Sequence, residues 1–265
     1  MTIPPMQPAS LRALHPLSNL APPAERIAVL DGQVAVASSD GSLWIGDRRL
    51  SAHKGPLVAL QVHGDGFLTA GRDGFAAIWD TDGRPLFVRR HPTGPICAAT
   101  LTDGTLVIAD DHGLVFAIDL HTGQSEWIGD LKSPITALSG SLGVVTMGTA
   151  HGTVHWDGFT EKRHRGKVLA IYPAGSCEVL SIGEDGRVRL GSELLLRVSE
   201  GVTACSLYQG RLLLAMDRDV QEWDLRSLTL LRSTTSTAGP VQDVALDASG
   251  AWVLIDGEGA PRHWS

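Results

Sequence analysis

The chain has 265 residues, a net charge of -7, 43% hydrophobic residues and 30 glycines. A chain of this length buries enough apolar surface to fold without a disulfide or a structural metal. An acidic chain repels phosphate backbones, and its four lysines (Lys54, Lys132, Lys162 and Lys167) form no basic run, so we expect no nucleic-acid partner.

The N-terminal segment, residues 1–20, lacks the apolar core of a signal peptide and is interrupted by prolines. No run of about 18 apolar residues follows it anywhere in the chain, so we expect no membrane span. These features predict a cytoplasmic protein.

From about residue 21 a unit recurs, and its clearest copy is HKGPLVALQVHGDGFLTAGRDGFAAIWD, from His53 to Asp80. Each unit contains short alternating or apolar strands joined by a dipeptide suited to a tight hairpin turn. These dipeptides recur about every 36 residues, at Asp40-Gly41, Asp73-Gly74, His112-Gly113, His151-Gly152, Asp185-Gly186, a degenerate Asp219-Val220 and Glu258-Gly259.

Seven such units predict an all-β fold, a seven-bladed β-propeller in which each small sheet packs between its neighbours. The last unit, from about Gly239, has three strands and lacks its outer one. We predict that residues around Ser10–Pro16 supply this strand and close the ring, because an open ring would expose sheet edges. The whole chain, 1–265, is then one domain, with residues 1–20 as extension and closing strand and 21–265 as seven blades.

The repeat resembles that of the WD40 family, whose blades share a hydrogen-bonded tetrad of His, Ser or Thr, Asp and Trp. The second blade matches all four positions, with His53, Thr69, Asp73 and Trp79. The fifth blade has His164, Ser181 and Asp185, with Gly191 at the tryptophan position, and other blades keep fragments such as Trp156-Asp157 and Trp223-Asp224. The resemblance implies a non-catalytic scaffold or adaptor that binds one or more proteins within a larger assembly.

One segment departs from this pattern. AIDLHTGQSEW, from Ala117 to Trp127, resembles the tryptophan-docking repeat of quinoprotein-like propellers, in which the tryptophan stacks between blades. It implies an alternative function, in which the central channel binds a small molecule or cofactor.

The cysteines, histidines and short motifs of the sequence do not predict a disulfide, a metal site or a catalytic site. Cys97, Cys177 and Cys205 lie in apolar stretches at wide spacing and are expected to be buried and reduced. His151 and His155 lie about 13 Å apart if both are on one strand, too far for one metal ion. The sequence has none of the nucleophile or phosphate-binding motifs searched for, so we expect no enzyme, no cofactor and no metal.

The hairpin turns carry the candidate binding residues. Carboxylates gather there and predict an acidic ring at one mouth of the channel, suited to a basic segment of a partner. The four charged residues that depart most from ordinary turn chemistry are Arg72, Asp111, Glu184 and Arg218. The alternative is that they are solvated turn residues with no partner.

Overall fold

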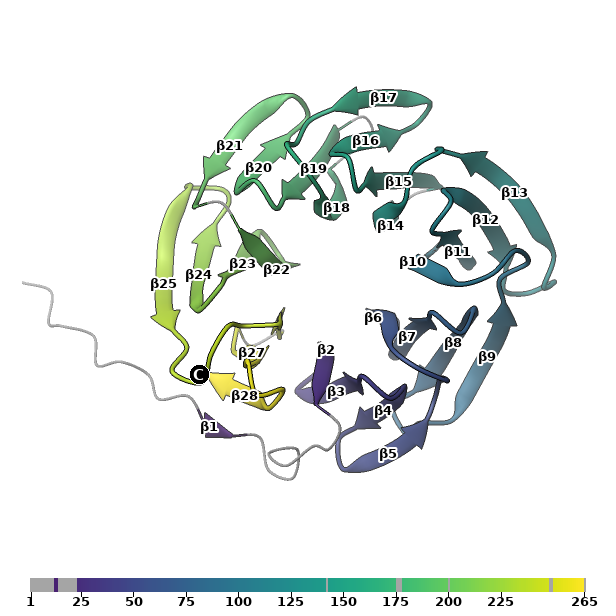
Figure 1. The fold of residues 1–265 in the computed structure, drawn as a ribbon, viewed down its shortest axis with the longest axis horizontal. Coiled ribbons are helices and arrows are strands. Elements are labelled where there is room, and N and C mark those ends of the chain that lie inside the picture. Colours follow the sequence, from purple (N-terminus) through teal and green to yellow (C-terminus); the bar gives the residue numbers. More distant parts are fainter. Residues whose placement is uncertain are drawn as a thin grey trace, which may run out of the picture.

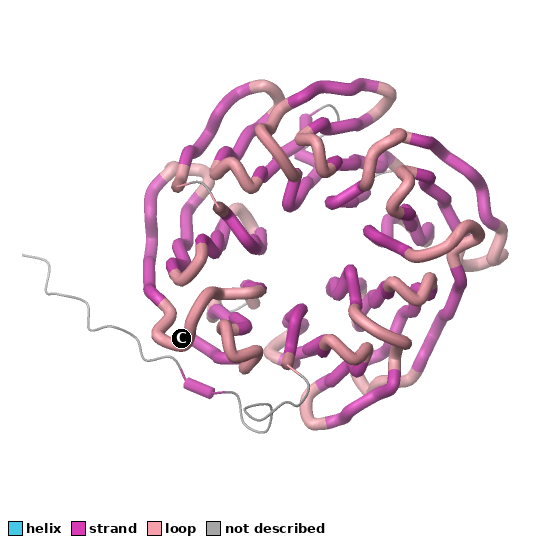
Figure 2. The backbone as a smooth tube through the Cα atoms, viewed as in Figure 1, coloured by secondary structure: helices cyan, strands magenta, loops and turns pink. Residues whose placement is uncertain are grey.

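The computed structural model describes residues 12–13, 23–141, 143–174, 178–199, 201–247 and 250–264. These residues form seven four-stranded antiparallel sheets arranged as blades around a central opening (Figure 1). Strands and loops account for all of the described backbone (Figure 2). The structure confirms the predicted all-β, seven-bladed propeller.

The strands follow the chain from the inside of each blade outward. Blade 1 comprises β2 (Ala24–Leu30), β3 (Gln33–Ser38), β4 (Ser42–Ile45) and β5 (Arg48–Ser51). Blade 2 comprises β6 (Leu57–His63), β7 (Gly66–Gly71), β8 (Phe75–Asp80) and β9 (Pro85–Arg90). Blade 3 comprises β10 (Ile96–Thr102), β11 (Thr105–Asp110), β12 (Leu114–Asp119) and β13 (Ser125–Asp130).

The remaining blades repeat this order. Blade 4 comprises β14 (Ile135–Ser141), β15 (Val144–Thr149), β16 (Thr153–Trp156) and β17 (Phe159–Lys162). Blade 5 comprises β18 (Val168–Ala174), β19 (Glu178–Gly183), β20 (Arg187–Leu190) and β21 (Glu193–Arg197). Blade 6 comprises β22 (Val202–Tyr208), β23 (Arg211–Met216), β24 (Asp219–Asp224) and β25 (Thr229–Thr235). Blade 7 comprises β26 (Asp243–Leu246), β27 (Trp252–Ile255), β28 (Pro261–Trp264) and β1 (Arg12–Ala13).

The ring is closed by the N-terminal segment, as predicted. Arg12 pairs with His263 and Ala13 with Arg262, so β1 is the outer strand of blade 7 (Figure 1). The other residues of the predicted closing segment, Ser10–Pro16, lie outside the described part of the chain. The N-terminal strand β1 and the C-terminal strand β28 therefore belong to one sheet, and β1 covers the edge that β28 would otherwise expose.

The core lies between the blades. The second strand of a blade is covered on both faces, so it reads as a continuous buried run; every residue of β7 is buried. One apolar cluster joins blades 1 and 2 through Leu43, Phe67 and Trp79. The outermost strands have one face toward solvent and carry exposed apolar side chains, among them Leu86 at 66% exposure.

Blade 6 corrects one prediction. The turn between β23 and β24 is formed by Asp217 and Arg218, and Asp219 already belongs to β24, paired with Met216. The turn dipeptide predicted for this blade, Asp219-Val220, therefore lies in β24 and not in the turn. Blade 6 has no glycine in this turn, and Asp217 instead adopts the positive φ of 53°.

Candidate protein-docking face

The tetrad of blade 2 forms one continuous chain of hydrogen bonds. Trp79 Nε1 donates to Thr69 Oγ1 at 2.8 Å, Thr69 Oγ1 lies 2.9 Å from His53 Nε2, and His53 Nδ1 lies 3.0 Å from Asp73 Oδ1. Asp73 also accepts the backbone N–H groups of Lys54 and Phe75. The structure thus brings the four predicted residues together, and the chain ties a buried strand to the turn at the surface.

The carboxylate at the end of this chain is ionised. Burial by itself raises the pKa of Asp73, but hydrogen bonds from Lys54 N–H, His53 and Phe75 N–H outweigh it and hold that pKa below its usual value. Gly71 is required beside the pair, because a Cβ there would lie 2.6 Å from His53 Nδ1 and 2.7 Å from the Asp73 carboxylate.

Blade 5 keeps the same arrangement without the tryptophan. His164 Nε2 lies 2.9 Å from Ser181 Oγ, and His164 Nδ1 lies 3.1 Å from Asp185 Oδ1. Asp185 Oδ2 accepts the N–H of Arg165 at 2.9 Å. Burial lowers the pKa of His164, so the neutral imidazole is favoured, as this hydrogen-bond chain needs.

Blade 3 contains a variant that sequence reasoning missed. His91 occupies the position in blade 3 that His53 occupies in blade 2. The backbone N–H of His91 donates to the carbonyl oxygen of Gly74 in the preceding blade, as that of His53 donates to Gly41. Its carboxylate partner lies two positions earlier than usual, at Asp110, and is reached through Thr93, whose Oγ1 donates to Asp110 Oδ2 at 2.7 Å.

The fragment His-Pro-Thr-Gly-Pro, which matches His-Lys-Gly-Pro of blade 2, was the available signal for His91. Burial lowers the pKa of the His91 imidazole.

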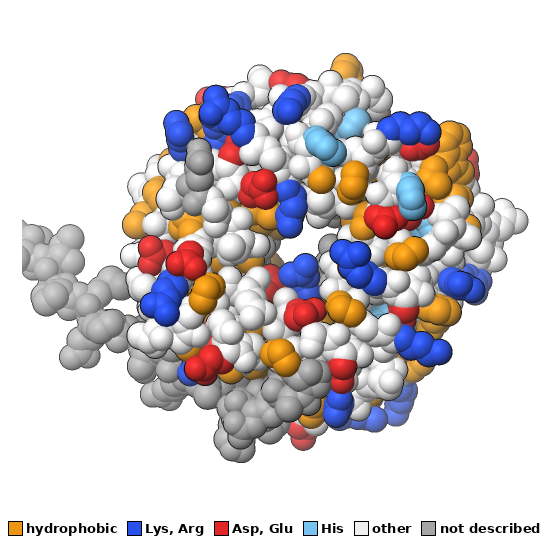
Figure 3. Space-filling model, in the orientation of Figure 1, with side chains coloured by type: hydrophobic (Ala, Val, Ile, Leu, Met, Phe, Trp, Pro, Cys, Tyr) orange, Lys and Arg blue, Asp and Glu red, His pale blue; other side chains and the backbone are white. Residues whose placement is uncertain are grey.

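In blades 2 and 5 these networks hold the turn between the second and third strands against the connection that leads into the innermost strand. Arg72 N–H donates to Pro56 O, and Glu184 N–H donates to Lys167 O at 3.0 Å. We call one side of the ring the channel-mouth face: it is formed by the turn between the second and third strands of each blade and by the connections that lead into the innermost strands. Figure 3 shows a face of the ring with acidic and basic side chains interspersed around the central opening.

All four candidate binding residues are exposed on these turns: Arg72, Asp111, Glu184 and Arg218. The first three occupy the same place in their turns. Arg218 is shifted by one, because Asp217 holds the equivalent place in blade 6. Arg72, Glu184 and Arg218 form no ion pair with another residue in the part of the chain that the structure describes.

The expected acidic ring is only partly available to a partner. Asp110, Asp185 and Asp256 are buried and accept backbone N–H groups of their own turns. The connections meanwhile contribute exposed Lys54 and Lys167. The channel-mouth face therefore presents both signs of charge.

One group of possible metal ligands lies on this face. Ligand atoms of Asp110, Asp111 and His112 lie within 4.8 Å of one another. Both oxygens of Asp110 are already engaged, by Thr93 Oγ1 and by the N–H groups of His112 and Leu114. These bonds account for the cluster as a stabilised turn.

The two histidines considered as metal ligands each have a local hydrogen-bond partner. His151 Nδ1 lies 2.9 Å from Ser133 Oγ, and His155 Nδ1 lies 2.9 Å from Thr160 Oγ1.

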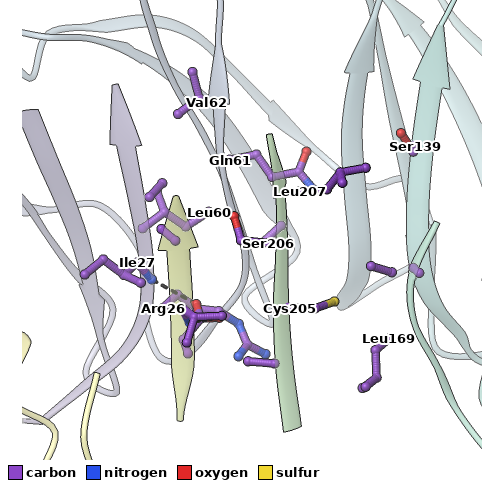
Figure 4. Close-up of a pocket in the computed structure, with 18 of the residues that line it drawn as sticks. Arg26, Ile27, Leu60, Gln61, Val62, Ser139, Leu169, Cys205, Ser206 and Leu207 are labelled. Atoms are coloured by element: carbon purple, nitrogen blue, oxygen red, sulfur yellow. Dashed lines mark hydrogen bonds between the residues drawn. The ribbon is translucent and has the colours of Figure 1, made fainter. Parts of the chain in front are cut away.

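The central channel has a volume of about 570 Å³ and is lined by the innermost strands (Figure 4). Cys97 and Cys205 face the channel and pack against core clusters, but they are half-buried and not fully buried as predicted. Cys177 lies outside the described residues. Burial raises the pKa of Cys97 to about 11 and that of Cys205 to about 12, so both thiols stay protonated at neutral pH. Cys97 donates to the backbone oxygens of Asp110 and Ile135, which links blades 3 and 4.

A charged pair lies where the channel wall joins blades 7 and 1. Asp243 Oδ2 accepts the N–H of Ile27 at 2.9 Å, the dashed bond in Figure 4, and Arg26 lies nearby. Burial raises the pKa of Asp243, and the positive charge of Arg26 opposes that shift. These groups join the last blade to the first inside the ring.

The tryptophan-docking expectation is wrong. Trp127 lies on the outermost strand of blade 3 and is 58% exposed, so it is not inserted between blades. Asp119 and Thr122 of this segment form the turn between β12 and β13, in which Asp119 Oδ1 accepts both the N–H and the hydroxyl of Thr122.

The comparisons with known proteins support the fold. No protein-family model matches the chain, and no curated protein shows significant sequence similarity to it. The Cps50 (Swd1) β-propeller domain of Myceliophteria thermophila superposes with a TM-score of 0.80 at 14% identity, covering 97% of this chain and 99% of that one. The computationally designed Ika8 protein gives a TM-score of 0.69 at 19% identity, covering 91% and 96%.

The chain is therefore similar in fold to a β-propeller domain of nearly the same extent. No described segment is a helix long and apolar enough to cross a membrane.

Proposed function

We propose that this propeller is a non-catalytic scaffold that docks a partner protein on its channel-mouth face. The proposal rests on the exposure of three charged side chains, Arg72, Glu184 and Arg218, and on their lack of an ion pair with described residues. Each is exposed on a turn fixed by backbone hydrogen bonds, and none is neutralised by an ion pair with a described residue. An exposed charge without an ion pair is free to pair with an opposite charge of a partner, and the fixed backbone of the turn sets where that charge is presented.

The charges also indicate the chemistry of the partner surface. Lys54 and Arg72 lie together on blade 2, so we expect an acidic group of the partner there. Glu184 and Asp217 lie on blades 5 and 6 beside exposed Lys167 and Arg218, so that side of the channel offers both signs of charge. The partner is thus a protein segment that carries both signs, and nucleic acid fits this arrangement poorly.

The test is an affinity purification from native lysate with the wild-type protein and two charge-reversal variants. Arg72→Glu/Arg218→Glu alters the channel-mouth face. Arg84→Glu/Arg226→Glu is the matched control, because both arginines are exposed on turns at the opposite side of the ring. A stoichiometric protein that is lost only from the first variant supports the proposal. A partner retained by both variants places docking elsewhere and refutes it.

The alternative function is binding of a small molecule in the central channel. Its volume of about 570 Å³ suits a ligand of ordinary size, but the motif that suggested a quinoprotein-like cofactor does not dock between blades. Native mass spectrometry of the purified protein distinguishes the two functions, because a bound small molecule without any protein partner favours the channel. We place the protein in the cytoplasm, where the thiols of Cys97 and Cys205 stay reduced.

A further inference from the structure

The junction of blades 3 and 4 is open where two comparable junctions are filled. Trp79 packs into the junction of blades 1 and 2, and Trp223 into that of blades 5 and 6. In blade 4 the equivalent residue follows Trp156 and is Asp157. A groove of about 580 Å³ lies there, between β11–β13 and β15–β17.

The groove follows directly from the loss of the blade 4 tetrad. Leu131 stands in the register of His53, Met147 in that of Thr69, and Asp157 in that of Trp79. All three line the groove. Leucine and methionine cannot form the polar chain, and a short carboxylate does not fill the volume of an indole, so the space remains open and largely apolar.

The rim of the groove exposes large apolar side chains. Ile128 of blade 3 is 39% exposed and Phe159 of blade 4 is 62% exposed, and both line the groove. The Phe159 ring stacks on Trp156 with centroids 5.8 Å apart, and the Arg163 guanidinium lies 4.2 Å from the centre of that indole. This rim is held in place before any ligand arrives, and exposed apolar groups gathered at a cavity indicate a binding surface.

The described residues that line the groove carry negative charge, and Arg163 next to its rim is paired with Glu161. Asp103 and Asp157 line it and are exposed, and no lysine or arginine is among its lining residues. Asp103 is positioned by the N–H of Gly143, which donates to its Oδ2 at 2.7 Å. An occupant with a positive charge next to an apolar side chain complements both features.

We infer that this groove binds an extended segment of a partner protein in which an aliphatic or aromatic side chain is flanked by lysine or arginine. The turns that carry Asp103 and Asp157 lie at the opposite side of the ring from the channel-mouth face. The groove is therefore a second docking site, independent of the first, and the scaffold can hold two partners at once.

The experiment selects peptides from a random phage-displayed library on the purified wild-type protein. The enriched peptide is then synthesised with a fluorescein label, and its affinity is measured by fluorescence anisotropy. Three variants alter the groove. Ala117→Leu fills it from blade 3, Asp103→Asn/Asp157→Asn removes its charge without changing its shape, and Phe159→Ser removes its apolar rim. Leu86→Ser is the matched control, because Leu86 is 66% exposed on the rim of blade 2.

We expect the enriched peptides to share an apolar residue flanked by lysine or arginine. Their affinity should fall at least tenfold in each groove variant and stay unchanged in Leu86→Ser. Circular dichroism melting curves verify that the variants are folded, and the charge-neutral pair keeps the test valid if the Ala117 variant is not. Acidic consensus peptides, no enrichment, or equal affinity for wild type and the groove variants would overturn the inference. None of these results depends on the channel-mouth partner, since the assay contains only purified protein and peptide.

Discussion

Replacing Thr69 by valine tests whether the blade 2 network stabilises the fold as its geometry indicates. Thr69 is fully buried and is bonded to both His53 Nε2 and Trp79 Nε1. Valine has nearly the same shape and no hydroxyl, so both nitrogens lose their partner inside the protein. An unsatisfied buried polar group costs about 1–3 kcal/mol. We therefore expect Thr69→Val to lower the free energy of unfolding by about 2–6 kcal/mol.

Blade 5 supplies an internal comparison. Ser181 is also fully buried, but among the described residues its hydroxyl is bonded only to His164, because Gly191 stands where the tryptophan would be. Ser181→Ala should therefore cost about 1–3 kcal/mol, the penalty of one orphaned group. Thr69→Ser is the conservative control, since it keeps the hydroxyl and removes a single methyl group worth about 1 kcal/mol.

The free energies of unfolding are measured by urea denaturation followed by far-ultraviolet circular dichroism, and melting temperatures by calorimetry. Each kcal/mol corresponds to about 2–4 °C in a protein of this size. The expected order of stability is Thr69→Ser above Ser181→Ala above Thr69→Val. If Thr69→Val and Thr69→Ser have the same stability, the hydrogen-bonded chain does not stabilise the blade and the reasoning is wrong.

Three further perturbations test other parts of the ring. Deleting residues 1–18 removes β1 and should markedly lower the melting temperature, because β28 loses its outer partner; an unchanged melting curve would contradict closure. Glu222→Ala should destabilise the protein by about 3–5 kcal/mol, because the buried Glu222 carboxylate pairs with Arg211 and Arg232 and accepts the Trp252 indole N–H; urea denaturation measures the loss. Burial lowers the pKa of His164 in the folded protein. Its contribution to stability is therefore full above the unfolded pKa of about 6.5 and is lost as the pH falls below that value. The melting temperature should fall from pH 8 to pH 5, and it should fall less steeply in His164→Gln.

The architecture could be predicted because it depends on short-range signals. Asp-Gly and His-Gly turns separate strands whose buried faces read directly as apolar runs, and their regular spacing gives the number of blades. The turn of blade 6 shows the limit. Arg218 and Asp219 were assigned one position late, because a turn without glycine offers no residue that marks where the positive φ falls.

The contacts between blades could not be predicted in the same way. Glu222 and Trp252 are separated by 30 residues yet share a buried hydrogen bond of 2.7 Å. His91 depends on Asp110 through Thr93, although no motif joins the three. Such pairings depend on which face of a strand meets the next blade, and a one-residue difference in register reverses that face. Trp127 was misassigned for another reason: its motif predicted docking between blades, whereas its strand is the outermost of blade 3 and leaves its side chain 58% exposed.

The junctions between blades differ in how they are filled, and this difference indicates where a ligand can bind. The junctions are filled by a tetrad tryptophan at Trp79, by the isoleucine Ile118 at the same register in blade 3, and by the Glu222 network between blades 6 and 7. Each solution fills a junction between two blades with different chemistry. A junction left unfilled costs stability because its apolar lining has no packing partner. The open junction at Asp157 is thus a site where a ligand can supply the missing contact, and binding there should raise the melting temperature of the whole ring.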